Sequence, residues 1–440
     1  MPDSFLLRAR WVVPVEPAGA VLHDHVVAVR DARVEAVLPA ARAIARFPDR
    51  ETIDLREHVL IPGFVNAHTH AAMALMRGIA DDLPLLRWLK EHIWPAEMRH
   101  VSERFVHDGT MLACAEMLRG GTTCFNDMYF YPEAALDAVL ASGMRAALGM
   151  IVVEFASSYA SDPDAYLDKG LALRDRWRDH PQLAFCFAPH APYTVSDETF
   201  RRIARLDGEV NVPVHIHLHE TEDEIERSVA EHGVRPIERL HRLGLLGPGL
   251  IAVHAVHLTE EEILLLARHG CSVVHCPSSN LKLASGFAPV ARLMRAGVNV
   301  ALGTDGAASN NRIDMMQEMR QAALLTKAVA RDAEAMPAHA ALRAATLAGA
   351  KALGLDQSMG SIVPGKWADL TAVRFSGPEL VPCYDPVSHL VYAAGREHVS
   401  DVWVGGKRLV ADGTLVNSAR FDLDMRGELW QNSLKTPPAS

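Results

Sequence analysis

Eight short apolar segments, each followed by a stretch with helical spacing, occupy the middle of this 440-residue chain. Their length suits buried parallel strands, and several of the stretches between them end in glycine, which is typical of a helix C-terminus. The segments read PGFVNAHTH, TTCFND, MRAALGMIVV, LAFCFAPH, VPVHIHLHE, LIAVHAVHL, CSVVHCP and VNVALGTDG. Eight strand-then-helix units predict an α/β fold, a (β/α)8 barrel of the TIM type. A doubly wound sheet is the alternative, but no G-x-G-x-x-G follows a strand.

The two ends of the chain show a different pattern, in which short alternating strands are separated by turns with Pro, Gly and Asp. Near the C-terminus, Gly405-Gly406 predicts a hairpin between two such strands. Because sheets made of two short pieces seldom stand alone, both ends are expected to meet in one small β-sandwich domain, residues 1–60 and 365–440. The barrel is expected to occupy residues 61–364.

Charge and cysteine usage exclude several classes of partner. The net charge is −10 and no Lys/Arg-rich run is present, so neither nucleic acid nor an anionic membrane is an expected partner.

The N-terminus lacks the pattern of a signal peptide, and no run of 18 apolar residues occurs. The six cysteines form no C-x-x-C pair, which argues for free thiols and against a Cys-ligated zinc. We expect a cytoplasmic protein.

Titratable side chains end most of the eight strand segments. They are His68 and His70 on the first, His190 on the fourth, His217 and Glu220 on the fifth, His254 on the sixth, His275 on the seventh and Asp305 on the eighth. In a barrel, the carboxyl ends of all strands meet at one mouth, where active sites are built. Residues more than 200 positions apart are therefore expected to come together.

Histidine and carboxylate in this arrangement favour a metal site. His68 and His70, at positions i and i+2 of an extended segment, point to the same side. On the fifth strand His215, His217 and His219 share one face, and only one of them need reach the metal; on the sixth, periodicity does not choose between His254 and His257. Three imidazoles and one carboxylate suit Zn²⁺ and tolerate Fe²⁺ or Mn²⁺. Such a site lowers the pKa of a bound water to roughly 7, which implies hydrolysis.

The same motifs carry a resemblance to a known family. PGFVNAHTH, HLHE, VHAVH and GTDGAASNN resemble the amidohydrolase superfamily, and the likeness continues through SNLKLASG, PVARLMRAGVNVALGTDG and PGKWADL over nearly the whole chain. Within that superfamily, ADDLPLLRWLKEHIWPAE and APHAPYTVS are most similar to the 5-methylthioadenosine/S-adenosylhomocysteine deaminases.

The resemblance implies a ligand set and catalytic roles. The ligands of a single Zn²⁺ would be His68, His70, His217 and Asp305, and the catalytic residues would be Glu220, His254 and Asp305. A bridging lysine at the end of the fourth strand would indicate two metals, but LAFCFAPHAPYTVS contains none. Glu220 would protonate the purine nitrogen beside the attacked carbon, while Asp305 and His254 would accept or orient the proton of the attacking water.

The resemblance also implies how an adenine nucleoside is bound. Glu97 would accept hydrogen bonds from the two ribose hydroxyls, Trp88 would form an apolar wall, His190 would hold the purine edge, and Met73, Met76 and Met128 are candidates for the pocket lining. Family members that accept S-adenosylhomocysteine readily tend to have arginines after the third strand, where this chain has Met150 followed by IVVEFASSYA. Without that clamp we expect 5′-methylthioadenosine to be preferred over S-adenosylhomocysteine and adenosine.

Other functions fit parts of the same pattern. A guanine or 8-oxopurine deaminase, or a chlorohydrolase acting on s-triazines, would use the same metal set, and only Glu97 and Trp88 argue against them. A non-catalytic scaffold is disfavoured because the four ligands and Glu220 are all present. Barrel enzymes of this kind commonly self-associate, so a homo-oligomer is expected.

Overall fold

The computed structural model describes residues 4–435, which form two compact units. The first unit contains the described residues up to Asn66, together with Ala115–Cys124 and Asp314–Ser418. The second contains Ala67–Cys114, Phe125–Ile313 and the described residues from Ala419 onward. The domain boundaries expected from the sequence, 1–60 with 365–440 and 61–364, stay a prediction.

Both ends of the chain contribute to one sheet in the first unit, as expected. Its order is β16-β15-β14-β13-β4-β1-β2-β3. The N-terminal strands are β1 (Ser4–Val12), β2 (Leu22–Arg30), β3 (Arg33–Pro39) and β4 (Thr52–Pro62), and the C-terminal strands are β13 (Leu370–Arg374), β14 (Val399–Val404), β15 (Lys407–Ala411) and β16 (Thr414–Leu415). The two sets join where β4 pairs antiparallel with β13. Gly405 and Gly406 have positive φ in the β14–β15 hairpin, which confirms that prediction.

Alternation along β1 provides the core on both faces of this sheet. Phe5, Leu7 and Ala9 belong to one buried cluster, which includes Trp403 of β14. Leu6, on the opposite face, packs in a second cluster that α1 (Ala40–Arg46) covers. This unit also contains α14 (Met315–Ala330), α15 (Ala338–Ala344), α16 (Leu347–Ala352), α17 (Pro386–Tyr392) and the short 3-10 helices η3 (Pro378–Leu380) and η4 (Arg396–His398).

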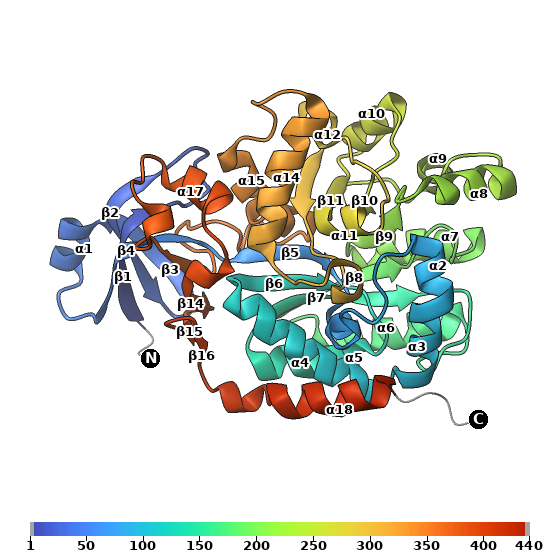
Figure 1. Ribbon diagram of the computed structural model, residues 1–440, viewed down its shortest axis with the longest axis horizontal. Coiled ribbons are helices and arrows are strands. Elements are labelled where there is room, and N and C mark those ends of the chain that lie inside the picture. The colour runs from blue at the N-terminus through green and yellow to red at the C-terminus, as the bar shows by residue number, and fades with distance from the viewer. Residues whose placement is uncertain (1–3, 436–440) are drawn as a thin grey trace. The chain divides into compact units, whose positions relative to one another are not determined.

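Eight parallel strands form the second sheet, in the order β12-β11-β10-β9-β8-β7-β6-β5. Strands β5 to β11 of this sheet are labelled in Figure 1. The eight strands are β5 (Phe64–Thr69), β6 (Thr122–Asp127), β7 (Arg145–Val152), β8 (Leu183–Pro189), β9 (Val214–Leu218), β10 (Leu250–His254), β11 (Ser272–His275) and β12 (Asn299–Leu302). Each lies in one of the eight segments read from the sequence. Past the end of β12, Asp305 N donates to His68 O at 3.1 Å, which brings the last strand back to the first. The sheet is a nearly closed barrel, and the predicted fold class is confirmed.

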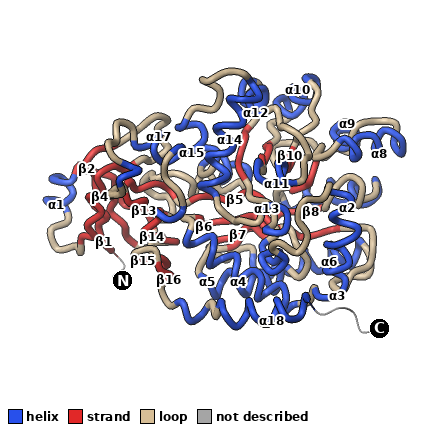
Figure 2. Tube along the Cα trace, viewed as in Figure 1, coloured by secondary structure: helices blue, strands red, loops and turns tan. Residues whose placement is uncertain are grey.

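Helices fill the connections between the barrel strands (Figure 2). They are η1 (Ala71–Met76), α2 (Leu85–Trp88), η2 (Leu89–Ile93), α3 (Trp94–His100), α4 (Glu103–Arg119), α5 (Pro132–Ser142), α6 (Pro163–Trp177), α7 (Asp197–Val210), α8 (Glu222–His232), α9 (Pro236–Arg242), α10 (Glu260–Arg268), α11 (Pro277–Lys282), α12 (Val290–Arg295) and α13 (Ala307–Asn310). Local sequence sets several starts: Ser196 caps α7, Thr221 caps α8 and Thr259 forms a capping box with Glu262 on α10.

Gly303, directly after β12, is required by the closeness of β12 to β5. A Cβ atom at this position would lie 2.9 Å from the backbone N and O of His68. Only glycine allows the two strand ends to approach this closely. The close approach brings Asp305, two residues later, beside the end of β5.

The C-terminal helix α18 (Leu423–Lys435) belongs to the second unit and lies along α4 (Figure 1). The indole Nε1 of Trp430 donates to Asp108 Oδ2 at 3.0 Å, and its ring meets that of Phe105 edge to face. The alternating pattern of the preceding strands gives no indication of this helix. Among residues 4–435, no helix has both the length and the apolar character that crossing a bilayer requires.

Candidate active site

Four side chains from three strand ends form one cluster in the second unit. They are His68, His70, His217 and Asp305, whose potential ligand atoms all lie within 4.8 Å of one another. The Nε2 atoms of His68 and His70 are each 3.2 Å from Asp305 Oδ1. These four residues are the ones that the sequence predicts as ligands. The barrel brings His68 and Asp305 together although they are 237 positions apart in the sequence.

Two of the histidines are oriented by backbone carbonyls. His70 Nδ1 donates to Met128 O at 2.6 Å, and His217 Nδ1 donates to His190 O at 2.7 Å. A carbonyl oxygen only accepts, so the proton of each neutral ring lies on Nδ1 and the lone pair on Nε2 faces the cluster. This donor arrangement fits a divalent metal ion such as Zn²⁺.

Asp305 is held as a carboxylate by several donors. Ser279 Oγ and Ser309 Oγ donate to Oδ2 at 2.6 and 2.8 Å, and Gly306 N donates to Oδ1 at 2.8 Å. Burial raises the pKa of Asp305, but the close imidazoles of His68 and His70 outweigh it and hold the pKa well below its ordinary value. The cluster therefore contains a fixed negative charge that favours a cation.

Sharp turns end the strands that carry these groups. His219, His254 and Asp305 have φ of 56°, 70° and 59°, in the left-handed region that side chains other than glycine seldom adopt. Such backbone strain is maintained where the surrounding structure demands it, often at functional sites. The turns occur one residue after β9, at the last residue of β10 and three residues after β12.

Glu220 and His254 lie beside the cluster and are buried. His254 Nε2 is 3.8 Å from Glu220 Oε2, while its Nδ1 is hydrogen-bonded to Asn280 Oδ1 at 2.8 Å. Burial raises the pKa of Glu220, so the carboxyl retains its proton at a higher pH than an exposed glutamate. Glu224 accepts from the backbone N of Glu220 at 2.8 Å and so fixes the loop.

His254 rather than His257 faces the site. His257 Nε2 is hydrogen-bonded to Ser285 O at 2.6 Å, and its carbonyl contacts His219 Nδ1 at 3.0 Å. His219 also accepts a hydrogen bond from Ile237 N. Both histidines therefore stabilise the loops after β9 and β10, which answers the choice that periodicity leaves open.

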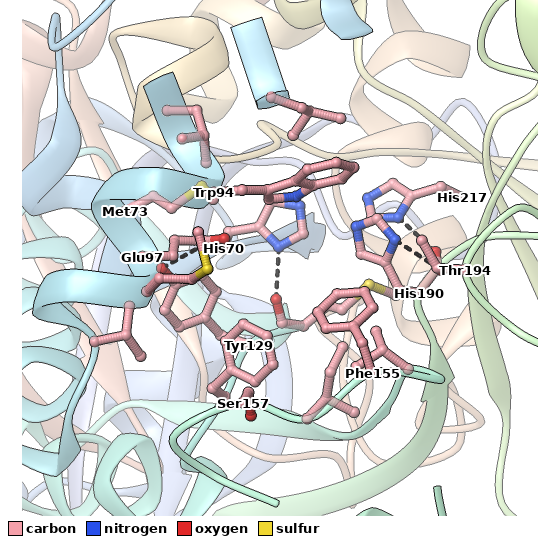
Figure 3. Close-up of a pocket in the computed structure, with 18 of the residues that line it drawn as sticks. His70, Met73, Trp94, Glu97, Tyr129, Phe155, Ser157, His190, Thr194 and His217 are labelled. Carbon is pink, nitrogen blue, oxygen red and sulfur yellow. Dashed lines mark hydrogen bonds between the residues drawn. The ribbon is translucent and has the colours of Figure 1, made fainter. Parts of the chain in front are cut away.

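Glu97, from α3, forms a second polar group near the cluster. Its Oε1 accepts a hydrogen bond from Tyr129 OH at 2.8 Å (Figure 3). Burial raises the pKa of Glu97 to about 7, although the bond from Tyr129 and the nearby charge of His70 act in the opposite direction. The carboxyl thus has hydrogen-bonding capacity left for a ligand.

A cavity of about 590 Å³ connects these groups (Figure 3). This volume is in the range of pockets that bind small organic molecules. The predicted residues that line it are His70, Trp88, Glu97, His190, His217, Glu220, His254 and Asp305, and Met73 and Met128 line it as well. His68 is buried behind this surface, and Met76 is buried outside the lining set.

Apolar side chains make up much of the cavity wall. The loop after β7 contributes Val153, Phe155 and Ala156 together with Ser157 and Ser158, and α3 contributes Trp94 and Met98. Phe155 and Met98 are 48% and 80% exposed, so they lie at the opening of the cavity toward solvent. No lysine or arginine is part of the lining formed by residues 4–435.

Several groups at the site were not identified from the sequence. Tyr129, Trp94, Phe155, Ser279, Ser309 and Asn280 all contact or line it. Tyr129 stands two residues after β6, so the rule that located the other strand-end residues applies to it too. The partners of Asp305 and His254 come from helices α11 and α13, and strand periodicity gives no signal for them.

Comparison with known proteins places these features in a family context. Residues 59–409 match the amidohydrolase family. The chain is 48% identical to the 5-methylthioadenosine/S-adenosylhomocysteine deaminase of Teredinibacter turnerae, over 98% of each chain.

Solved structures show the same fold. A crystal structure of an adenosine deaminase from Xanthomonas campestris with bound zinc aligns with a TM-score of 0.97 at 50% identity, over 98% of this chain and 99% of that one. An atrazine chlorohydrolase from Arthrobacter aurescens complexed with zinc aligns with a TM-score of 0.89 at 23% identity, over 98% and 100% of the two chains. The second likeness is one of fold alone.

Proposed function

The chain belongs to the amidohydrolase family, whose members are metal-dependent hydrolases, and we propose that it hydrolyses the amino group of adenine nucleosides, with 5′-methylthioadenosine as the preferred substrate. The observation that supports this most directly is that a single cavity is lined by the ligand cluster, apart from His68, and also by Glu220, His254 and Glu97. The relative from Teredinibacter turnerae and the zinc-containing structure from Xanthomonas campestris support the substrate class.

A single Zn²⁺ is the proposed cofactor, held by His68, His70, His217 and Asp305. When bound, the ion supplies positive charge that makes a water acidic and stabilises negative charge developing on oxygen. The cluster offers four donors, and β8 ends at Pro189 and is followed by His190, with no lysine to bridge a second ion. One ion per chain is therefore proposed.

Proton transfers can be assigned to the remaining groups. Asp305 accepts a proton from the attacking water, which His254 orients, as the water oxygen bonds to the carbon that bears the amino group. Glu220, whose pKa is raised by burial, donates a proton to the adjacent ring nitrogen and so makes that carbon electrophilic. Asp305 passes its proton to the amino group, which leaves as ammonia. The new hydroxyl returns its proton to Glu220, and the product is the inosine analogue.

The apolar side chains in the cavity wall support a preference for the methylthio group. S-adenosylhomocysteine would place a carboxylate and an ammonium where residues 4–435 provide no basic side chain to pair with the carboxylate. The 5′-hydroxyl of adenosine would face an apolar wall. The methylthio group instead matches Phe155, Val153 and Met98 in polarity.

A substrate panel tests this function. We expect deamination of 5′-methylthioadenosine with a kcat/KM about tenfold or more above that for S-adenosylhomocysteine or adenosine, and little turnover of adenine. Ultraviolet absorbance and ammonia release measure the reaction. Guanine and a chlorinated s-triazine belong in the same panel, and faster turnover of either, with release of ammonia or chloride, would refute the proposal.

Glu97 is the proposed contact to the ribose diol. Replacing Glu97 by alanine is expected to raise KM for 5′-methylthioadenosine by about 10- to 100-fold, because charge-assisted hydrogen bonds to both hydroxyls are lost. KM for free adenine is expected to change much less. Glu91→Ala, at an exposed glutamate of η2, is the matched control. Equal effects of Glu97→Ala on both compounds would remove the ribose assignment.

Cytoplasmic location and self-association stay predictions, as does the absence of nucleic acid or membrane partners.

A further inference from the structure

His215 provides the third anchor of the ligand cluster, and it differs in kind from the other two. Its ring is fully buried, and its Nε2 lies 2.9 Å from Nδ1 of His68. His70 and His217 are anchored by carbonyls, which only accept. An imidazole nitrogen either donates or accepts, so the contact between His68 and His215 has two possible proton arrangements.

The two arrangements differ at the nitrogen of His68 that faces the cluster. If His68 Nδ1 donates to His215 Nε2, then His68 Nε2 has a free lone pair and the proton of His215 is on Nδ1. If His215 Nε2 donates instead, the proton of His68 is on Nε2, next to Asp305 Oδ1 at 3.2 Å. Each arrangement places two protons on the pair, so the difference is one of position and not of charge.

The surroundings of His215 do not decide between them. Its Nδ1 is buried and has no hydrogen-bond partner in the part of the chain that the structure describes. If His68 Nδ1 donates, the N–H at Nδ1 of His215 is left unpaired. If His215 Nε2 donates, Nδ1 of His215 is instead an unpaired acceptor. A metal ion bound to His68 Nε2 needs the lone pair of that nitrogen, so the proton of His68 lies on Nδ1. His215 Nε2 must then accept the hydrogen bond.

We propose that His215 is a positioning residue for the metal, which accepts a hydrogen bond from His68 Nδ1 through its Nε2 and so holds His68 in the tautomer that binds the ion. This inference rests on the metal site proposed above. Partners of this kind affect metal affinity by about 10- to 100-fold when removed. The role is specific to one nitrogen atom and separable from the contribution of the ring to packing.

Two substitutions distinguish loss of the hydrogen-bond acceptor of His215 from loss of its side-chain volume. Glutamine presents a side-chain oxygen near the position of Nε2, whereas methionine fills the space without a strong acceptor. Zinc affinity is measured by competition with a chromophoric chelator, starting from metal-stripped protein. His215→Met is expected to bind zinc about 10- to 100-fold more weakly than the parent, and His215→Gln within about threefold of it. Equal losses in both variants, or no loss in either, would overturn the proposal.

His275 offers a matched control, since it is a buried histidine at the end of β11 whose Nδ1 also lacks a partner within residues 4–435. His275→Met and His275→Gln are expected to have the same zinc affinity as each other, within about threefold. Thermal unfolding of all four variants detects any that fail to fold. A methionine-specific loss at both positions would show that the effect is not particular to His215.

Nitrogen-15 spectra of the zinc-loaded parent protein report the tautomers directly. We expect the proton of His215 on Nδ1 and that of His68 on Nδ1, with the His215 signals assigned by their absence from His215→Gln. A proton on Nε2 of His215 would contradict the proposal. If the parent takes up no zinc, the proposed metal site itself is wrong; unchanged tight binding by His215→Met would refute this inference alone.

Discussion

Replacement of Glu220 by glutamine is expected to lower kcat for 5′-methylthioadenosine by about 10²- to 10⁴-fold, while the protein retains its metal. Glutamine has nearly the same shape but no acidic proton to give to the ring nitrogen. Glu220 is not among the four clustered ligands, and its carboxyl lies 3.8 Å from His254 Nε2. Steady-state kinetics and metal analysis of the purified variant measure the two effects.

Glu222→Gln is the matched control for that experiment. Glu222 is two residues further along the chain, at the first position of α8, and its side chain is 81% exposed. This control is expected to keep the parental kcat. A Glu220→Gln enzyme that turns over at the rate of the parent would show that another group supplies the proton.

Removal of the one acidic ligand is expected to weaken metal binding strongly. In Asp305→Asn the amide replaces a carboxylate that lies between two histidines, and zinc affinity is expected to fall by more than about 100-fold. The kcat/KM for the nucleoside is expected to fall with it, by about 10³-fold or more. Metal content after dialysis and the rate of ammonia release measure the two losses.

Reconstitution distinguishes loss of the ion from damage to the fold. The parent enzyme, stripped with a chelator, is expected to regain activity when Zn²⁺ is added, whereas Asp305→Asn is expected to remain inactive at the same concentration. Thermal unfolding of both metal-free proteins provides the control for folding. Full activity of Asp305→Asn with stoichiometric zinc would show that Asp305 is neither ligand nor proton carrier.

The barrel could be predicted because its strands are apolar runs of the right length, separated by helical spacing. Once eight parallel strands are assumed, topology brings the strand ends to one mouth, so His68 and Asp305 are predicted to meet without any knowledge of coordinates. The same rule applies to Tyr129, two residues after β6, but an aromatic side chain there does not by itself indicate a role.

Other details depend on local geometry that periodicity does not encode. His215, His217 and His219 share one face by alternation, but the left-handed turn at His219 directs the chain away after the strand, and only His217 joins the cluster. His215 contacts His68 from deeper in the strand. Ser279 and Ser309 reach Asp305 from short helices, whose positions depend on how the connections pack.

Met128 and His190 each contribute two different parts to the site. Their side chains line the cavity, while their main-chain oxygens orient His70 and His217. Substitution changes a side chain but leaves the carbonyl in place. These two positions can therefore be randomised in a library that seeks new nucleoside specificities without removing the carbonyls that orient His70 and His217.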